Sequence, residues 1–280
     1  MTPAIGPNRL KARLAAGEIV TAFMVTMPSV AMAQVLAASG VDCLIIDMEH
    51  GPIDIATVHA MVAATRGTEA TPIVRVPWTE HWLVKPVLDT GAMGINFPMV
   101  SSVELARAGA AALRYPPEGV RGVAPSYAPL RWGLGMAEYL KQANREMLNV
   151  ITIEDEEAVR NLDAILAVPG IDVVAIASFD LSMSLGVPGQ LDHPKLTALV
   201  GEAEAKVKRA GIPLAGVALT AEAARAKRAA GYQMLLMGFD VQMVEGAARG
   251  AVAAARDGAI QATVGQQRIS DRSVIQAAGI

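Results

Sequence analysis

The chain has 280 residues, of which 52% are hydrophobic, 4% are aromatic and 18% are charged, and its formal net charge is -3. This hydrophobic, weakly charged composition excludes an intrinsically disordered chain. The small net charge gives no electrostatic reason to expect nucleic acid or an anionic membrane as a partner. The single cysteine, Cys43, cannot form an internal disulfide or a cysteine-based zinc site, and its apolar neighbours predict a buried, inert thiol.

Residues 19–41 carry no charge, and as a helix they would be long enough to cross a bilayer of ~30 Å. Residues 31–33 also resemble a signal-peptidase site. Against export, Pro28 interrupts the apolar run and Glu18 stands where a cationic flank is expected. We therefore predict a strand, a turn at Pro28 and a buried helix in a cytoplasmic protein, with export as the alternative.

Short apolar runs alternate with longer, alanine-rich amphipathic runs along the whole chain. The predicted strands are residues 19–25, 43–47, 73–76, 94–98, 150–154, 173–177, 214–218 and 234–238. The predicted helices are residues 29–39, 53–66, 82–90, 102–113, 156–167, 194–210, 221–230 and 241–256. The strands are mostly continuous in hydrophobicity, which is typical of parallel strands buried on both faces.

This alternation predicts an α/β protein with one closed (β/α)8 TIM barrel domain over residues 1–260. An open doubly wound sheet is the alternative, although the nearest glycine-rich turn, Gly133-Leu134-Gly135, follows no predicted strand. Residues 115–133 are a candidate functional loop, because they are too long for an ordinary connection. Residues 261–280 are predicted to be a tail that is disordered or docks on a neighbouring subunit.

Polar residues follow the second predicted strand, at the barrel end where catalytic groups gather. Asp47, Glu49 and His50 come within four residues, and desolvating two acids and a histidine is costly without a purpose. Histidine titrates near neutral pH, so His50 is a candidate acid/base, with Asp47 and Glu49 in support. The alternative is an ordinary polar turn in which Asp47 accepts backbone donors and Pro52 begins the next helix.

The third predicted strand contains an arginine, Arg75, among apolar residues. An arginine in such a place is seldom buried unless it meets an anion, and its planar fork suits a carboxylate or phosphate. A salt bridge to Asp47 or Glu49 is the structural alternative, and both interpretations can hold together.

Carboxylates follow the fifth and sixth predicted strands, at Glu154 and Asp180. Neighbouring strands lie ~4.8 Å apart, so two such carboxylates repel unless a proton or a cation lies between them. Their oxygen atoms suit Mg²⁺ or Mn²⁺. The alternatives are a helix-dipole interaction for Glu154 and an N-cap role for Asp180 in a turn that begins at Leu181.

Asp89 lies near the end of a predicted helix, where the helix dipole disfavours an acid, so it either orients another group such as a histidine or lies on the surface.

The lysines fall in predicted helices or near the N-terminus and not at a strand exit, which argues against a Schiff-base mechanism.

Six ordered blocks carry a resemblance to a known family. They are IIDMEHGPID, PIVRVPW, LDTGAMGINFPMV, RYPPEGVRGV, ITIEDEEAVRNLDAIL and ASFDLSMSLGVPGQLDHP. In this order and spacing the chain resembles the HpcH/HpaI aldolases, which are metal-dependent pyruvate aldolases of aromatic catabolism that act on compounds such as 4-hydroxy-2-oxoheptanedioate.

The resemblance implies a TIM barrel whose last helix is exchanged between subunits in a homotrimer or hexamer. It implies Glu154 and Asp180 as ligands of Mg²⁺, Mn²⁺ or Co²⁺, Arg75 as the group that binds the pyruvyl oxygens, and His50 with Asp89 as the acid/base dyad. The family's Gly-Pro beside the substrate carboxylate is replaced here by Ala177-Ser178, which changes that pocket.

The expected activity is therefore metal-dependent, reversible aldol cleavage of a 4-hydroxy-2-oxo acid to pyruvate and an aldehyde. The alternatives are a citrate-lyase-like acyl-CoA lyase acting on malyl- or citramalyl-CoA, and a decarboxylase or carbon–carbon ligase of oxaloacetate type on the same barrel. A third alternative is a non-catalytic binding or assembly subunit, which the presence of the catalytic and metal-binding candidates disfavours: His50, Arg75, Asp89, Glu154 and Asp180.

Overall fold

The structure is a computed structural model that describes residues 8–256, so the predicted tail at residues 261–280 lies outside the described residues. Internal contacts divide the chain after Asp240. The first unit is a barrel, and the second contains the helix that continues to Arg256. The expectation that this helix is exchanged between subunits stays a prediction.

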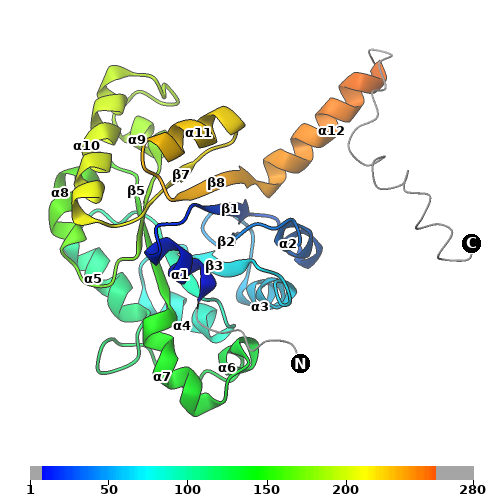
Figure 1. Cartoon of the computed structure of the whole chain (residues 1–280), viewed down its shortest axis with the longest axis vertical. Helices are drawn as coiled ribbons and strands as arrows, with labels where there is room; N and C mark the ends of the chain where they lie inside the picture. The colour runs from blue at the N-terminus through cyan, green and yellow to red at the C-terminus, as the bar shows by residue number, and fades with distance from the viewer. Residues whose placement is uncertain (1–7, 257–280) are drawn as a thin grey trace, which may run out of the picture. The chain divides into compact units, whose positions relative to one another are not determined.

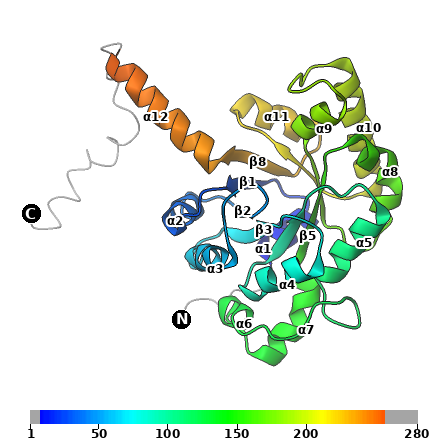
Figure 2. The same ribbon diagram turned by 180° about the vertical axis from the view of Figure 1, so that it is seen from behind.

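Eight parallel strands form a closed barrel in chain order, and β8 pairs with β1 to close it. They are β1 (Val20–Val25), β2 (Cys43–Asp47), β3 (Thr71–Arg75), β4 (Gly94–Phe97), β5 (Leu148–Ile153), β6 (Val173–Ile176), β7 (Leu214–Val217) and β8 (Met234–Phe239). Figures 1 and 2 show helices surrounding these strands. The closure confirms the predicted (β/α)8 barrel and excludes the open sheet.

All eight predicted helices are present within a few residues of their predicted bounds. They are α2 (Val30–Ala37), α3 (Ile55–Ala64), α4 (His81–Asp89), α5 (Val103–Ala112), α8 (Glu156–Leu166), α10 (Pro194–Ala210), α11 (Ala221–Ala229) and α12 (Asp240–Arg256). Side chains that precede several of them cap the free N–H groups of the first turn, as Asp54, Ser102 and Thr220 do for α3, α5 and α11.

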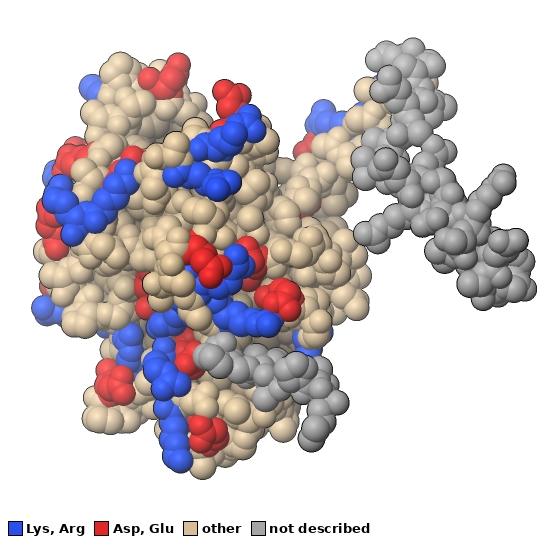
Figure 3. All heavy atoms as spheres, viewed as in Figure 1, with Lys and Arg blue, Asp and Glu red and all other residues tan. Residues whose placement is uncertain are grey.

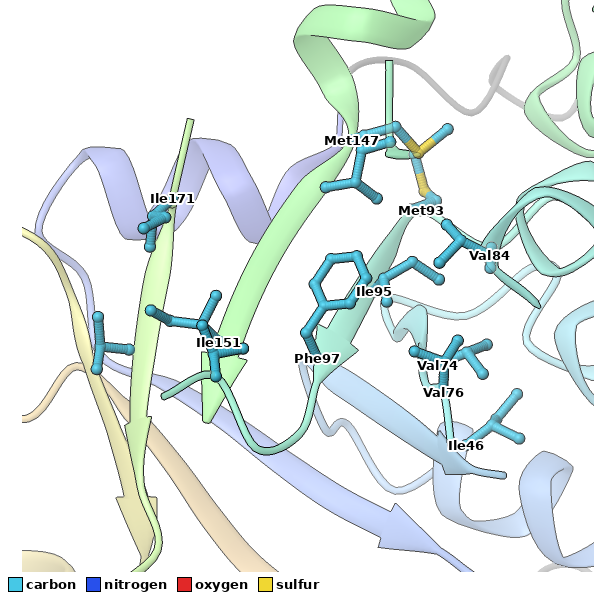
Figure 4. Packing of buried hydrophobic residues seen from close by; sticks show 14 of the residues in the cluster. Ile46, Val74, Val76, Val84, Met93, Ile95, Phe97, Met147, Ile151 and Ile171 are labelled. Atoms are coloured by element: carbon cyan, nitrogen blue, oxygen red, sulfur yellow. The ribbon is translucent and has the colours of Figure 1, made fainter. Parts of the chain in front are cut away.

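Successive strand residues point to opposite faces and so supply two separate hydrophobic clusters. Ile45, Ile73 and Val150 belong to the cluster inside the barrel, together with the buried thiol of Cys43, whose pKa burial raises. Residues of alternate parity pack outward against the helices. Figure 4 shows several of them: Ile46, Val74, Val76, Ile95, Phe97 and Ile151.

A short helix that the sequence pattern did not predict, α1 (Arg9–Ala15), closes the N-terminal end of the barrel. Leu10 and Leu14 join the inner cluster. The Asn8 side chain, which caps α1, donates to the carbonyl of Met93 at 2.8 Å, just before β4. Because this end is filled and hydrogen-bonded, the opposite end of the barrel is the one open to chemistry.

The predicted loop at residues 115–133 is partly helical and well anchored. It contains α6 (Ala128–Trp132), which is followed by α7 (Met136–Glu146). The Arg121 side chain is fully buried, donates to Asp89 Oδ1 at 2.7 Å and to the Tyr139 hydroxyl at 3.1 Å, and stacks over the Tyr115 ring. Packing against the barrel therefore holds much of this segment.

The Asp89–Arg121 pair predicts a large loss of stability on substitution. Asp89→Ala is expected to lower the free energy of unfolding by about 3 kcal/mol, because it leaves a buried guanidinium without its carboxylate. Urea unfolding followed by circular dichroism measures this loss. The control is Asp163→Ala, which removes an exposed partner of Arg209 and should cost under about 1 kcal/mol. An equally small loss of unfolding free energy in both variants would contradict a stabilising role for the Asp89–Arg121 pair.

On the face shown in Figure 3, Lys and Arg side chains lie interspersed with Asp and Glu, and neither charge dominates. Residues 19–41 form β1, a turn at Pro28 and α2, as predicted. Within residues 8–256, no helix combines the length and the hydrophobicity that crossing a bilayer requires.

Candidate active site

The candidate residues that end or follow strands lie together at the carboxyl end of the barrel. Asp47 and Arg75 are the last residues of β2 and β3, and they are register partners in the sheet. Glu154 directly follows β5, and Asp180 lies in α9 (Ser178–Ser184), which directly follows β6 and Ala177. The topology thus brings together the predicted strand-exit residues.

Asp47 holds the Arg75 side chain in one orientation. The fully buried Asp47 carboxylate accepts from Arg75 Nε at 2.8 Å and from Nη2 at 2.7 Å, and Asp47 Oδ1 also accepts from the Glu49 N–H at 3.0 Å. Burial by itself lowers the pKa of Arg75, but the bond and charge of Asp47 and the charges of Glu49 and Glu154 raise it above its ordinary value. The guanidinium is therefore a fixed, permanent positive charge.

Glu49 is held between Arg75 and His50. Its Oε2 atom lies 3.1 Å from Arg75 Nε and 3.7 Å from His50 Nε2. This oxygen is buried and, among the described residues, has no partner with hydrogen-bond geometry. Burial raises the pKa of Glu49, against the opposing charges of Arg75 and His50.

The His50 side chain is exposed, with 69% of its surface accessible. It lies in the turn after β2, which packs closely against the end of β1. A side chain at Gly51 would clash with the Asp47 carbonyl oxygen and would lie 2.7 Å from the Thr26 carbonyl oxygen. The close approach explains why glycine follows His50.

Glu154 is a buried carboxylate, with 8% exposure, and it accepts a hydrogen bond from the backbone N–H of Met99. Met99 has a φ of 52°, in the left-handed region that non-glycine residues rarely adopt. Burial raises the pKa of Glu154 to about 7; the Met99 N–H and Arg75 oppose this shift, and the charges of Glu49 and Asp180 add to it. Asp155 caps α8, so Glu154 stands one residue before the N-cap, and its interaction with the helix dipole stays a prediction.

Asp180 is exposed and lies in the first turn of α9. This helix begins at Ser178 and is preceded by Ala177 as its N-cap, so the N-cap interpretation of Asp180 is wrong. The reason is that the helical turn already begins at Ser178, which places Asp180 inside the first turn and not before it. The Ala177 N–H donates to the Ile153 carbonyl at 3.1 Å, which ties the start of α9 to the residue before Glu154.

Asp89 is the predicted site residue that the single chain does not bring to the others. Its carboxylate bonds to Arg121, and the hydrogen bonds of residues 8–256 include none between Asp89 and His50. The histidine partner expected for Asp89 is thus replaced, within one chain, by an arginine from the loop after α5. The dyad stays a prediction.

The carboxylates fit a divalent cation. The charges of Glu49 and Asp180 both raise the Glu154 pKa, so negative charge is concentrated there with Arg75 as the nearby counter-charge. Carboxylate oxygens are suitable ligands for Mg²⁺ or Mn²⁺. In the described part of the chain, no three His, Cys, Asp or Glu side chains are arranged to hold a metal ion. The expectation that Glu154 and Asp180 are the metal ligands stays a prediction.

Sequence reasoning missed several residues that build the site. Met99 contributes a backbone N–H, which has no signature in the side-chain pattern. Asn96 and Thr152 are buried polar residues on β4 and β5 that bond to each other at 2.8 Å, and their polarity within apolar strands was an available signal. Asp240, which is buried at the start of α12, accepts a hydrogen bond at 2.8 Å from the hydroxyl of the half-buried Thr26 just after β1.

Known proteins share the sequence pattern and the fold of this chain. Residues 22–247 match the sequence model of the family described as HpcH/HpaI aldolase/citrate lyase. A hydroxypyruvate/pyruvate aldolase of Roseovarius nubinhibens is 35% identical over 242 residues, covering 86% of this chain and 94% of the relative. A 5-keto-4-deoxy-D-glucarate aldolase of Salmonella paratyphi A is 35% identical over 213 residues, covering 76% and 83%. A crystal structure of a family protein from Burkholderia cenocepacia J2315 has a TM-score of 0.83 at 34% identity, covering 89% and 99%.

Proposed function

This chain belongs to the HpcH/HpaI aldolase/citrate lyase family and is a carbon–carbon lyase, and we propose that it catalyses the reversible aldol cleavage of a 4-hydroxy-2-oxo acid to pyruvate and an aldehyde. The observation that carries the proposal is the placement of a fixed Arg75 beside the carboxylates of Glu49 and Glu154 at the barrel mouth. Such a site combines positive charge for an anionic substrate with acidic side chains for a cation.

Glu154 and Asp180 would hold a divalent cation, with Mg²⁺ and Mn²⁺ as the first candidates and Co²⁺ as a third. When bound, the cation supplies Lewis acidity toward the carboxylate and 2-oxo oxygens of the keto acid. Glu154 is pre-positioned for this by the Met99 N–H, which fixes one of its oxygens.

Arg75 binds the oxygen on which negative charge develops as the C3–C4 bond breaks. Asp47 engages its Nε and Nη2 atoms, so the remaining edge of the guanidinium faces the substrate. Because the charge is fixed before the reaction, no reorganisation is needed when the enolate forms.

His50 removes the proton of the C4 hydroxyl group as that carbon becomes an aldehyde. Its exposure at the mouth allows proton exchange with solvent, and Glu49 lies on its inner side. Asp89 is the partner proposed for His50 by family resemblance. Ala177 and Ser178, at the start of α9, are proposed to shape the pocket for the substrate carboxylate.

An aldol screen tests the proposal. The enzyme, supplemented with Mg²⁺ or Mn²⁺, is incubated with pyruvate or hydroxypyruvate and a panel of aldehydes, including succinic semialdehyde and hydroxylated aldehydes. We expect 4-hydroxy-2-oxo acids as products and pyruvate release in the reverse direction. Malyl-CoA and citramalyl-CoA are the comparison substrates. Cleavage of these thioesters without any aldol activity would contradict the proposal and favour the acyl-CoA lyase. Oxaloacetate decarboxylation is expected of either enzyme and does not separate them.

A further inference from the structure

A buried carboxylate outside the proposed catalytic group connects the last strand of the barrel to the first. Asp240 is the last residue of the barrel unit and the first residue of α12, and it is fully buried. Its Oδ1 accepts from the Thr26 N–H at 2.9 Å and from the Thr26 hydroxyl at 2.8 Å, and its Oδ2 accepts from the Met27 N–H at 2.9 Å. The carboxylate thus fixes the backbone directly after β1.

The backbone that Asp240 fixes is the surface against which the His50 turn rests. Any Cβ atom at Gly51 would lie 2.7 Å from the Thr26 carbonyl oxygen and 3.2 Å from the Thr26 Cα atom. The turn therefore packs backbone to backbone against Thr26, with no side chain between them to absorb a shift. A displacement of Thr26 is transmitted to Gly51 and so to His50.

We propose that Asp240 is a positioning residue that holds the catalytic turn through Thr26 and Gly51. The proposal rests on the proposed role of His50 as the base. Asp240 acts through its two backbone hydrogen bonds and does not touch the substrate. Arg75 is oriented separately by Asp47, so loss of the Asp240 contacts should disturb proton transfer more than substrate binding.

Asp240→Asn is the sharpest variant, because it keeps the volume and removes one acceptor. If the amide oxygen faces Thr26, the amide NH₂ group meets the Met27 N–H; in the flipped orientation it meets the Thr26 N–H. In either orientation a donor faces a donor. The expected loss in kcat is about tenfold, the scale of a modest misplacement of a catalytic group. KM for the hydroxy-oxo acid should stay within about twofold, because Arg75 is not displaced.

The opposite end of the same strand supplies a matched control. Asp42 accepts from the Thr21 N–H at 2.7 Å and from the Thr21 hydroxyl at 2.9 Å, near the start of β1 and far from the catalytic turn in register. Its other oxygen pairs with Arg13, so in Asp42→Asn the amide donor faces either Arg13 or Thr21, and the variant should have a lower Tm and an unchanged kcat. Thr26→Ser keeps the hydroxyl and should retain kcat, whereas Gly51→Ala should reduce it as Asp240→Asn does.

Hydrogen exchange of the peptide that contains residues 47–55 provides a readout independent of activity. We expect faster exchange in Asp240→Asn than in wild type and no change in Asp42→Asn. Equal kcat losses in the two Asn variants, or unchanged exchange in Asp240→Asn, overturn the proposal. If wild type shows no aldol activity, the proposed function fails, and the exchange comparison still decides whether Asp240 holds the turn.

Discussion

Arg75→Ala is expected to lower kcat/KM for aldol cleavage by about a thousandfold, which is the upper range for loss of one pre-organised donor to a developing oxyanion. Arg75 is held by the two hydrogen bonds that it donates to the buried Asp47, and it lies near the negative charges of Glu49 and Glu154. Its removal leaves the charge on the substrate oxygen without the fixed guanidinium. Pyruvate release, followed with lactate dehydrogenase as coupling enzyme, measures the loss.

A second variant of Arg75 is needed because Arg75 has a buried partner, Asp47. Because Arg75→Ala leaves Asp47 without its counter-charge, it also lowers stability, and circular dichroism must show that the variant is folded. Arg75→Lys retains the charge but loses the two-point contact, and we expect an intermediate loss of about tenfold to a hundredfold. Arg145→Ala, at an exposed arginine on α7, is the matched control and should keep full activity. A folded Arg75→Ala enzyme with more than half the wild-type rate would falsify the assigned role.

Removal of divalent metal is expected to abolish turnover, with activity falling below about one hundredth of the wild-type value, since the Lewis acid supplies several kcal/mol of charge stabilisation. Arg75 would be the remaining positive group at the substrate oxygen. Chelation followed by gel filtration and elemental analysis defines the apo state, and addition of Mn²⁺ or Mg²⁺ should restore the rate. Circular dichroism of the apo enzyme should be unchanged, because the barrel core contains no part of the site. Full activity in a preparation shown to be free of metal is the outcome that excludes the mechanism.

The strands and most helices could be predicted because their signals are local. An apolar run such as Cys43–Asp47 and a cap such as Asp54 indicate their element wherever the chain places them. α1 and α9 are short, and their positions depend on contacts with the barrel end or with the residue before Glu154, as for Leu10 and Ala177. Periodicity over seven residues is too weak to indicate such a helix.

The candidate site was predictable where chemistry depends on residues at strand ends. Asp47, Arg75 and Glu154 end or follow strands, and topology alone brings strand ends together. The parts of the site that were not predicted depend on backbone conformation and on contacts between residues far apart in the sequence. Met99 contributes an N–H through a left-handed residue, and Asp240 reaches Thr26 across 214 positions of sequence. No pattern within one segment can show either contact.

A partner for Asp89 was predicted from the sequence, but in the described chain that partner is an arginine and not a histidine. The helix dipole indicated that this acid needs a partner, and the structure supplies Arg121 from the long loop after α5. The arginine was not identified because that loop has no periodic pattern, and its burial depends on stacking with Tyr115.

The most direct test of the account is a titration of the metal-free enzyme with Mn²⁺, followed by electron paramagnetic resonance. The wild-type chain is predicted to bind Mn²⁺ at a site that both Glu154→Gln and Asp180→Asn weaken by at least about a hundredfold, since each removes a charged ligand. Asp155→Asn, which retains the α8 cap beside Glu154, should bind as wild type does. Unchanged Mn²⁺ affinity in both ligand variants would show that these two carboxylates do not share the cation.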